Sequence, residues 1–291
     1  SHPFLRGKVV DGACFSQLGN CPGGATRASG LTAGRPTLGN DHGTHVAGII
    51  AGRDSSRQGV APEARLLAIQ AFSRSGDQLG ATDADLLAAL DWVYAQRNRY
   101  SIAAVNLSVG GGAYNSYCDA GSPYTAIFRL LRQAGIVPVV ASGNESKTSA
   151  IAAPACVSYA VSVGSIDKSG DVSAFSNSWQ KLSLLAPGGD IDSSVLGAAY
   201  AAKSGTSMAA PHVAGALALL RAARPQATAE DVLSALIRGG TPRRDGRNGL
   251  VSAQIELQQA LKLLPVPEPA RSAPPVPEPT PEPRRRPDSP A

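Results

Sequence analysis

Three short segments carry side chains that could act together on a carbonyl group. His42 and His45 lie in the run 41–48, Asn144 follows a predicted strand, and Ser207 begins a predicted helix. A serine hydroxyl is a weak nucleophile, so it needs a neighbouring base and a site for the developing oxyanion. We therefore predict Ser207 as a nucleophile, His42 as its general base and Asn144 as an oxyanion donor.

Ser207 and Asn144 also have ordinary structural explanations. Ser207 could simply be a helix N-cap, and Asn144 could belong to a Gly-Asn turn. The backbone N–H of Ser207 lies at a helix start, has no intrahelical partner, and could therefore donate to an oxyanion. We expect Pro211 to lie in the first turn of this helix, where a missing N–H costs nothing.

Of the four histidines in the chain, His42 is the best candidate for a base. We expect His2 to lie at a frayed chain start, and His45 and His212 to pack within helices. Because His42 and His45 are three residues apart, a metal pair is an alternative. The sequence has no His-Glu-x-x-His pattern and no obvious third carboxylate, which favours the catalytic interpretation.

Short apolar segments alternate with amphipathic ones along the chain. The pattern predicts strands at 66–69, 102–107, 136–141 and 159–163, and helices from about 83, at 125–134, at 207–223 and at 229–238. Thr82 and Thr228 are expected N-caps, and Gly135 is an expected C′ residue. The alternation predicts an α/β fold, a doubly wound, mainly parallel sheet with helices on both faces. Ligands of such sheets bind at the carboxyl ends of the strands.

Composition excludes several classes of protein. The chain has 291 residues, of which 43% are hydrophobic and 17% charged, and its net charge of +5 comes from scattered residues. We therefore expect no nucleic-acid partner, and the absence of a run of about eighteen apolar residues argues against a membrane span. Residues 265–291 contain eleven of the 22 prolines, which predicts an extended, disordered tail or linker after a domain at 1–264.

The four cysteines indicate disulfides rather than a metal site. They are Cys14, Cys21, Cys118 and Cys156, with no Cys-x-x-Cys pair. An even count favours two disulfides and an oxidising compartment, so we expect a secreted or periplasmic protein. Three pairings are open, and we favour Cys14 with Cys21, which would close a short loop, and Cys118 with Cys156. Free buried cysteines are the alternative.

Taken together, the motifs resemble those of the subtilisin-like serine peptidases. The family's histidine motif is intact at residues 42–48, and its serine motif, Gly-Thr-Ser-Met-Ala-x-Pro-His-Val-Ala-Gly, is intact at 205–215. Residues 142–144 resemble the oxyanion segment, and 106–111 resemble the strand that pairs with substrate. Further matches lie at residues 59–62, 175–177, 186–188 and 249–253. The resemblance covers about residues 1–262.

The resemblance implies a serine endopeptidase that hydrolyses peptide bonds in proteins through an acyl-enzyme on Ser207, with His42 as base. Asn144 and the Ser207 amide would hold the oxyanion. The substrate would add a β-strand along a short segment, Ser108, Val109 and Gly110. Protein or peptide substrates are implied, with a monomer and an N-terminal propeptide in the full gene product. Small residues at 152 and 153 would leave a roomy pocket for apolar side chains.

The chain departs from the family in lacking its Asp-[Ser/Thr]-Gly motif. Asp11 is followed by glycine and precedes His42, but His2 and Pro3 resemble the stretch that lies just after that motif. Asp41 is adjacent to His42 and cannot turn back onto its ring. We therefore expect the catalytic aspartate, and the strand that carries it, upstream of residue 1, and a nearly inactive fragment without them. A binding protein that lost its activity is the second hypothesis.

No cofactor is expected. Family members often place aspartate calcium ligands where this chain has Phe4 and Ser183, and its loop at 53–58 is short and lacks the usual asparagine. The usual calcium positions therefore look absent, although an unrelated calcium site stays an alternative.

Overall fold

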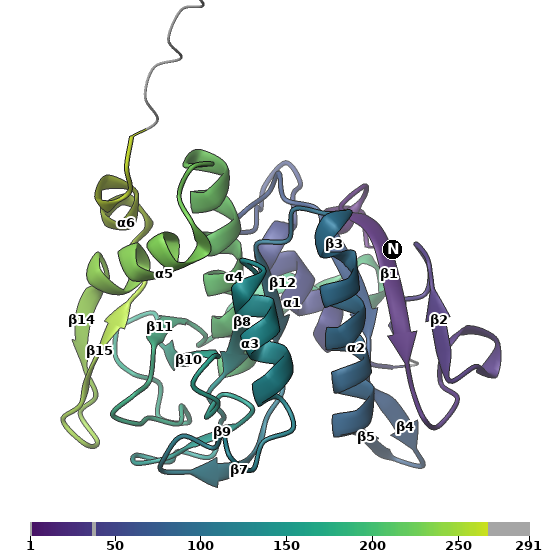
Figure 1. Cartoon of the computed structure of the whole chain (residues 1–291), viewed down its shortest axis with the longest axis horizontal. Helices are drawn as coiled ribbons and strands as arrows, with labels where there is room; N and C mark the ends of the chain where they lie inside the picture. The colour runs from purple at the N-terminus through teal and green to yellow at the C-terminus, as the bar shows by residue number, and fades with distance from the viewer. Residues whose placement is uncertain (1, 37–38, 267–291) are drawn as a thin grey trace, which may run out of the picture.

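Two sheets form the centre of the molecule, and helices cover them on both sides (Figure 1). The computed structural model describes residues 2–36 and 39–266. The larger sheet has the strand order β14 (Thr241–Arg244), β15 (Val251–Gln254), β11 (Leu184–Pro187), β10 (Val161–Ile166), β8 (Val137–Ala141) and β6 (Ala104–Leu107). Its strands are parallel except β14. The smaller sheet has the order β2 (Arg27–Ser29), β1 (Val9–Phe15) and β3 (Leu66–Gln70), with β1 and β3 parallel.

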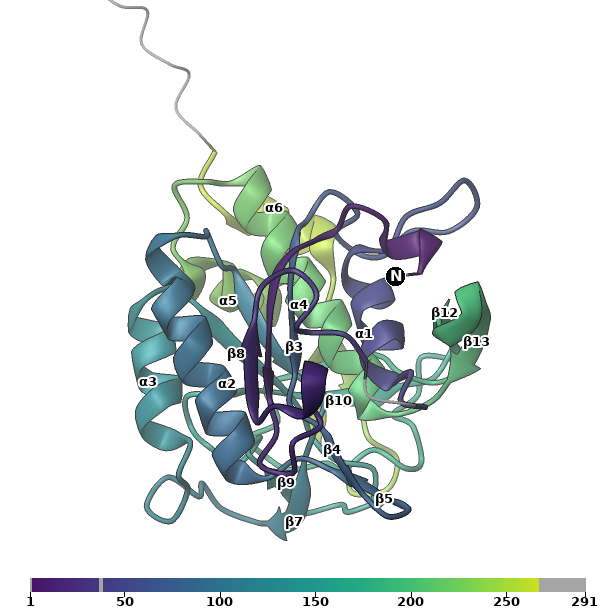
Figure 2. The same ribbon diagram turned by 90° about the vertical axis from the view of Figure 1, so that its right-hand side faces the viewer.

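The helices lie in two layers (Figure 2). The α-helices are α1 (His42–Ala51), α2 (Asp83–Ala95), α3 (Thr125–Gln133), α4 (Thr206–Ala223), α5 (Ala229–Arg238) and α6 (Leu257–Leu263). One layer contains α2 and α3, and the other contains α4 with α1, α5 and α6 packed beside it. Successive residues of a strand point to opposite faces, so Val139 packs with Leu217 of α4, whereas Val140 packs with Phe128 of α3. This arrangement is the α/β fold that the sequence predicts.

Short elements complete the chain. Three two-stranded pairs are antiparallel: β4 (Ser73–Ser75) with β5 (Gln78–Gly80), β7 (Gly111–Tyr114) with β9 (Ile151–Ala153), and β12 (Ile191–Ser194) with β13 (Tyr200–Lys203). Short 3₁₀ helices lie at Pro3–Leu5, Pro22–Gly24, Gln96–Asn98 and Leu196–Ala198. The serine side chains of β12 approach α1 so closely at Gly48 that only a glycine fits there. A Cβ at this position would lie 2.3 Å from the hydroxyl of Ser193.

Most predicted elements are confirmed, with small shifts at their ends. Thr82 and Thr228 cap α2 and α5 through their side chains, and Gly135 follows α3 with a φ of 75°. The strand predicted at 102–107 begins at Ala104, and the one predicted at 159–163 is observed at Val161–Ile166. His45 and His212 lie within helices, as predicted.

Two predictions are wrong. His2 is not frayed but buried, because its ring accepts a hydrogen bond from the Phe4 amide and bonds the carbonyl oxygen of Ala199 at 2.9 Å. Pro211 does not lie in the first turn of its helix, because α4 begins at Thr206 and places Pro211 in the second turn.

The two sheets do not hydrogen-bond to each other. In the part of the chain that the structure describes, β3 pairs only with β1, and β6 pairs only with β8. Ile69 of β3 and Val105 of β6 nevertheless pack against one apolar cluster. Except at their last residues, both strands are only half-buried, whereas every residue of β8 is buried. Each of these two central strands therefore has one edge without a strand neighbour.

Both favoured disulfides are present, Cys14 with Cys21 and Cys118 with Cys156. Among the described residues, no helix is long and apolar enough to cross a membrane. The predicted tail at 265–291 lies outside the described residues from 267 onward, and the domain boundary at 264 stays a prediction.

Candidate active site

The predicted nucleophile lies at the beginning of α4, where a strand-to-helix turn meets the carboxyl ends of β6 and β8. Ser207 is the second residue of the helix, so its N–H has no intrahelical acceptor. No other acceptor for this N–H is present among the residues that the structure describes. The preceding Gly205 has a φ of 156°, which residues with a side chain rarely adopt. Ser207 thus presents both a hydroxyl and a free backbone donor.

Asn144 lies beside this turn, three residues after the end of β8. Its side-chain oxygen accepts hydrogen bonds from the N–H of Thr206 at 2.8 Å and from the Thr206 hydroxyl at 3.0 Å. Its Nδ2 has no partner within the described residues and would lie 3.6 Å from a Cβ built on Gly205. Because Oδ1 is fixed by Thr206, the free amide donor is held next to Ser207. Two N–H donors from separate elements therefore meet at the nucleophile, as an oxyanion site requires.

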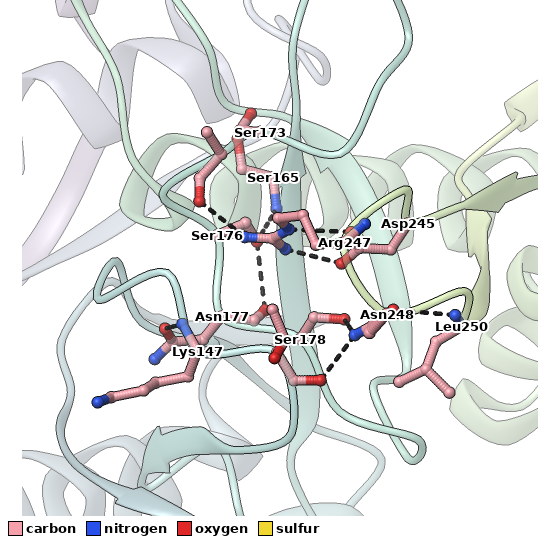
Figure 3. A network of polar contacts seen from close by, with 12 residues as sticks. Lys147, Ser165, Ser173, Ser176, Asn177, Ser178, Asp245, Arg247, Asn248 and Leu250 are labelled. Carbon is pink, nitrogen blue, oxygen red and sulfur yellow. Dashed lines mark hydrogen bonds and ion pairs between the residues drawn. The ribbon is translucent and has the colours of Figure 1, made fainter.

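Asn177 holds the loop that carries Asn144, and Figure 3 shows it beside Lys147 of this loop. Asn177 is fully buried, and its amide nitrogen donates to the carbonyl oxygen of Ser142 at 3.3 Å and to the Glu145 carboxylate at 2.6 Å. Its amide oxygen accepts from the backbone N–H groups of Glu145 at 3.1 Å and of Lys147 at 3.0 Å. Its own N–H donates to the carbonyl oxygen of Gly143. One side chain therefore fixes the loop on both sides of Asn144.

The same network reaches the turn between β14 and β15 (Figure 3). Asn248 donates to the hydroxyl of Ser178 at 3.0 Å and to the carbonyl oxygen of Thr148 at 2.7 Å. Arg247 forms an ion pair with the buried Asp245 at 2.7 Å. These contacts join the oxyanion loop to an element about a hundred residues further along the chain. The sequence singles out 175–177 only as a family match, so the role of Asn177 is visible only in three dimensions.

His42 is the first residue of α1, which packs against α4. Burial lowers the pKa of His42 below its ordinary value; Lys203 and His45 lower the pKa further, and Asp41 opposes them. The ring is therefore held in its neutral, proton-accepting form near neutral pH. Among the described residues, no hydrogen bond joins this ring to Ser207 or to a carboxylate. The hydroxyl of Ser207 instead points to the carbonyl oxygen of Ser108, at 3.4 Å.

An ion pair flanks the histidine. Lys203, at the end of β13, donates to the carboxylate of Asp41, which immediately precedes His42. Both side chains are about one-third exposed. Sequence reasoning excluded Asp41 as the residue that orients His42 but did not find its partner, because the two residues are 162 positions apart.

Asp11 lies away from the histidine. Its carboxylate accepts hydrogen bonds from Arg99 at 3.1 Å, from the hydroxyl of Tyr100 at 3.0 Å and from the N–H of Gly12. This placement agrees with the expectation that Asp11 falls past the site. The structure thus assembles Ser207, Asn144 and Ser108, and leaves the ring of His42 without a carboxylate partner in the described residues.

The predicted substrate-binding segment begins where β6 ends. Ser108 is buried against Ser207, Val109 is half-buried and Gly110 is exposed. A Cβ added to Gly110 would lie 3.0 Å from the Cβ of Ala152, a buried residue of β9. The small residues expected to line a specificity pocket are therefore close to this segment.

The metal-pair alternative is not favoured by the surroundings of His45. Its Nε2 lies 3.0 Å from the carbonyl oxygens of both Ile191 and Ala201, where it acts as a donor. No three potential metal-ligating side chains lie together in residues 2–36 and 39–266. The expectation that no cofactor is needed stays a prediction.

Comparison with known proteins agrees with the motifs. The subtilase family model matches residues 26–254. The chain is 32% identical over 274 residues to an intracellular serine protease of Paenibacillus polymyxa, covering 86% of this chain and 74% of that protein. It is 38% identical over 205 residues to an extracellular serine proteinase of Thermus sp. (strain Rt41A), covering 70% of this chain and 46% of that protein, so it spans about half the length of this relative. The solved structure of the prenylagaramide maturation protease PagA aligns with a TM-score of 0.71 and 26% identity over 91% of this chain and 89% of that one.

The fold and these similarities define the class as α/β serine peptidases. The chain belongs to the subtilase family.

Proposed function

We propose that this chain contains the catalytic domain, residues 1–264, of an endopeptidase that cleaves proteins through an acyl-enzyme on Ser207. The observation that carries the proposal is the fixed amide of Asn144, whose oxygen is occupied by Thr206 and whose nitrogen is free beside Ser207. His42 takes the hydroxyl proton as Ser207 attacks the scissile carbonyl carbon. The resulting oxyanion accepts hydrogen bonds from Asn144 and the Ser207 N–H. His42 then donates its proton to the leaving amine, and water releases the acyl group by the same steps.

The carboxylate that orients His42 is proposed to come from a strand that precedes Ser1. The unpaired edges of β3 and β6 support this proposal, because both are parallel strands of the molecule's centre and both are only half-buried. Backbone N–H and C=O groups at such edges need partners, which an inserted strand would supply. The carboxylate would fix the ring orientation and tautomer of His42.

The remaining features concern substrate and location. Ser108 to Gly110 would bind an extended peptide through main-chain hydrogen bonds, with apolar side chains entering beside Ala152 and Ala153. The two disulfides support a secreted or periplasmic location. Residues 265–291 are proposed as a linker. A propeptide is proposed to precede the domain. We also propose that the domain needs no calcium. We propose a monomer.

A fluorophosphonate probe tests the chemistry. The full-length gene product should be labelled on Ser207, and its Ser207→Ala variant should not be. The 1–291 chain alone should cleave casein roughly 10⁴-fold more slowly than the full-length protein, because it lacks the orienting carboxylate. Equal rates would show that the carboxylate proposal is wrong. A folded full-length protein that resists the probe would favour the alternative of a binding protein.

A further inference from the structure

Pro211 leaves a main-chain carbonyl oxygen in α4 without its usual donor. In an α-helix the N–H of each residue donates to the carbonyl oxygen four residues earlier. Pro211 has no N–H, and the residue four positions earlier is Ser207. The carbonyl oxygen of the proposed nucleophile therefore has to be satisfied from outside the helix.

The donor is the side chain of Ser108. Its hydroxyl lies 2.7 Å from the carbonyl oxygen of Ser207, and Ser108 is only 9% exposed. The direction of this bond is fixed, because a carbonyl oxygen can only accept, and the amide nitrogen of Asn106 donates to the same hydroxyl oxygen at 2.9 Å. An amide N–H₂ cannot accept, so the hydroxyl proton of Ser108 is free to go to Ser207. A chain of two hydrogen bonds thus runs from β6 into the first turn of α4.

We propose that Ser108 is a positioning residue whose hydroxyl replaces the helix N–H that Pro211 lacks and thereby fixes the main chain of Ser207. This inference rests on the proposed function of Ser207. The main chain of Ser108 begins the segment proposed to bind substrate, so one residue sets the distance between the peptide and the nucleophile. It also orients the peptide unit next to the Ser207 N–H, the second oxyanion donor.

A double-mutant cycle with Pro211→Ala tests the replacement. In the full-length protein, Ser108→Ala is expected to lower kcat about tenfold with little change in KM, since the loss concerns positioning rather than ground-state binding. Pro211→Ala supplies a helix N–H to the carbonyl oxygen of Ser207. In that background Ser108→Ala should lower kcat less than about threefold, because the carbonyl keeps a donor. Ser108→Thr, which keeps the hydroxyl, should retain most of the activity.

Ser193→Ala is the matched control. Ser193 is also a buried serine that donates to a helix carbonyl oxygen, that of His45, at 2.8 Å. The residue four positions later, Ile49, keeps its N–H, so Ser193→Ala should have the same effect with and without Pro211→Ala.

The same cycle is measured by urea unfolding, which needs no activity. A loss of stability from Ser108→Ala that shrinks in the Pro211→Ala background supports the replacement. Equal losses in both backgrounds, or a KM effect with kcat unchanged, would overturn the inference. Failure of the wild-type protein to react with a fluorophosphonate would instead overturn the proposed function, whatever the unfolding cycle gives.

Discussion

Replacing Asn177 with alanine should loosen the oxyanion loop. The side chain makes four hydrogen bonds, two to backbone N–H groups of the loop, one to a backbone carbonyl oxygen and one to the Glu145 carboxylate. Each such bond contributes about 0.5–1.5 kcal/mol net. Residues 144–149 are exposed, so water can replace part of the lost bonding and the lower values apply. Four bonds at the low end, with the space left by a fully buried side chain, give a loss of about 3 kcal/mol.

The effect on catalysis should be smaller than loss of the donor itself. Removing an oxyanion donor lowers kcat by about 10²–10³-fold. Asn144 would keep its bonds to Thr206 in the Asn177→Ala variant, so we expect about a tenfold fall in kcat. Urea unfolding gives the stability, and steady-state hydrolysis by the full-length protein gives kcat. A stability loss below about 1 kcal/mol, or unchanged kcat, would refute the role assigned to Asn177.

Asn177→Asp separates the donor from the acceptor half of this side chain. The aspartate keeps both acceptor contacts but places a carboxylate oxygen against Glu145, 2.6 Å from the present nitrogen. Burial and this like charge raise the pKa of the new carboxyl above its unfolded value, so the variant should lose stability as pH rises through the acid range. Asn177→Ala should show no such added pH dependence. Asn248→Ala, elsewhere in the network, should cost stability with little change in kcat.

Two further predictions concern the base and the loop. Lys203→Met should raise the pKa of His42 and move the acid limb of kcat/KM to higher pH, whereas Asp41→Asn should lower this pKa and move the limb to lower pH. NMR titration of the His42 ring measures the pKa without any need for activity. Asp11→Asn is the control, which should leave the titration of His42 unchanged. Shifts in the same direction for both variants would contradict the charge assignment. Gly143→Ala should destabilise the fold by about 2 kcal/mol or more in urea unfolding, since φ is 108° and a Cβ would lie 2.2 Å from a side-chain nitrogen; a neutral result would show that the loop can relax.

The sequence predicted best what depends on neighbours within a few residues. Thr82 and Thr228 predict the starts of their helices because an N-cap side chain accepts from the N–H three residues later. Gly135 predicts the end of α3 because the residue after a helix often has a positive φ, which glycine adopts easily. The alternation of such segments sufficed for the α/β class. Ser207, His42 and Asn144 could be predicted as site residues because they belong to contiguous motifs.

What the sequence did not predict depends on contacts between distant segments. His2 looked like a frayed end because nothing near it in the chain could bury it, yet its partner is Ala199. Pro211 was predicted to lie in the first turn of a helix that begins at Ser207. The helix begins one residue earlier, at Thr206, and Pro211 is its sixth residue. Asn177 and Lys203 carry no local mark of their roles, since the groups they hold lie at least thirty positions away for Asn177 and more than one hundred for Lys203.

The two halves of the proposed site are held in different ways. Ser207 and Asn144 are fixed by side-chain to main-chain bonds that cross between elements, from Ser108 and through Thr206. The ring of His42 has no such bond in the described residues; its position in α1 and a ring contact with Phe72, 6.4 Å between centroids, place it. A fixed nucleophile and oxyanion site beside an unoriented base supports the proposal that a further carboxylate orients His42. We expect that carboxylate on the side of the unpaired edges of β3 and β6, since Asp41 is paired with Lys203 and Asp11 lies away from the histidine, bound to Arg99 and Tyr100.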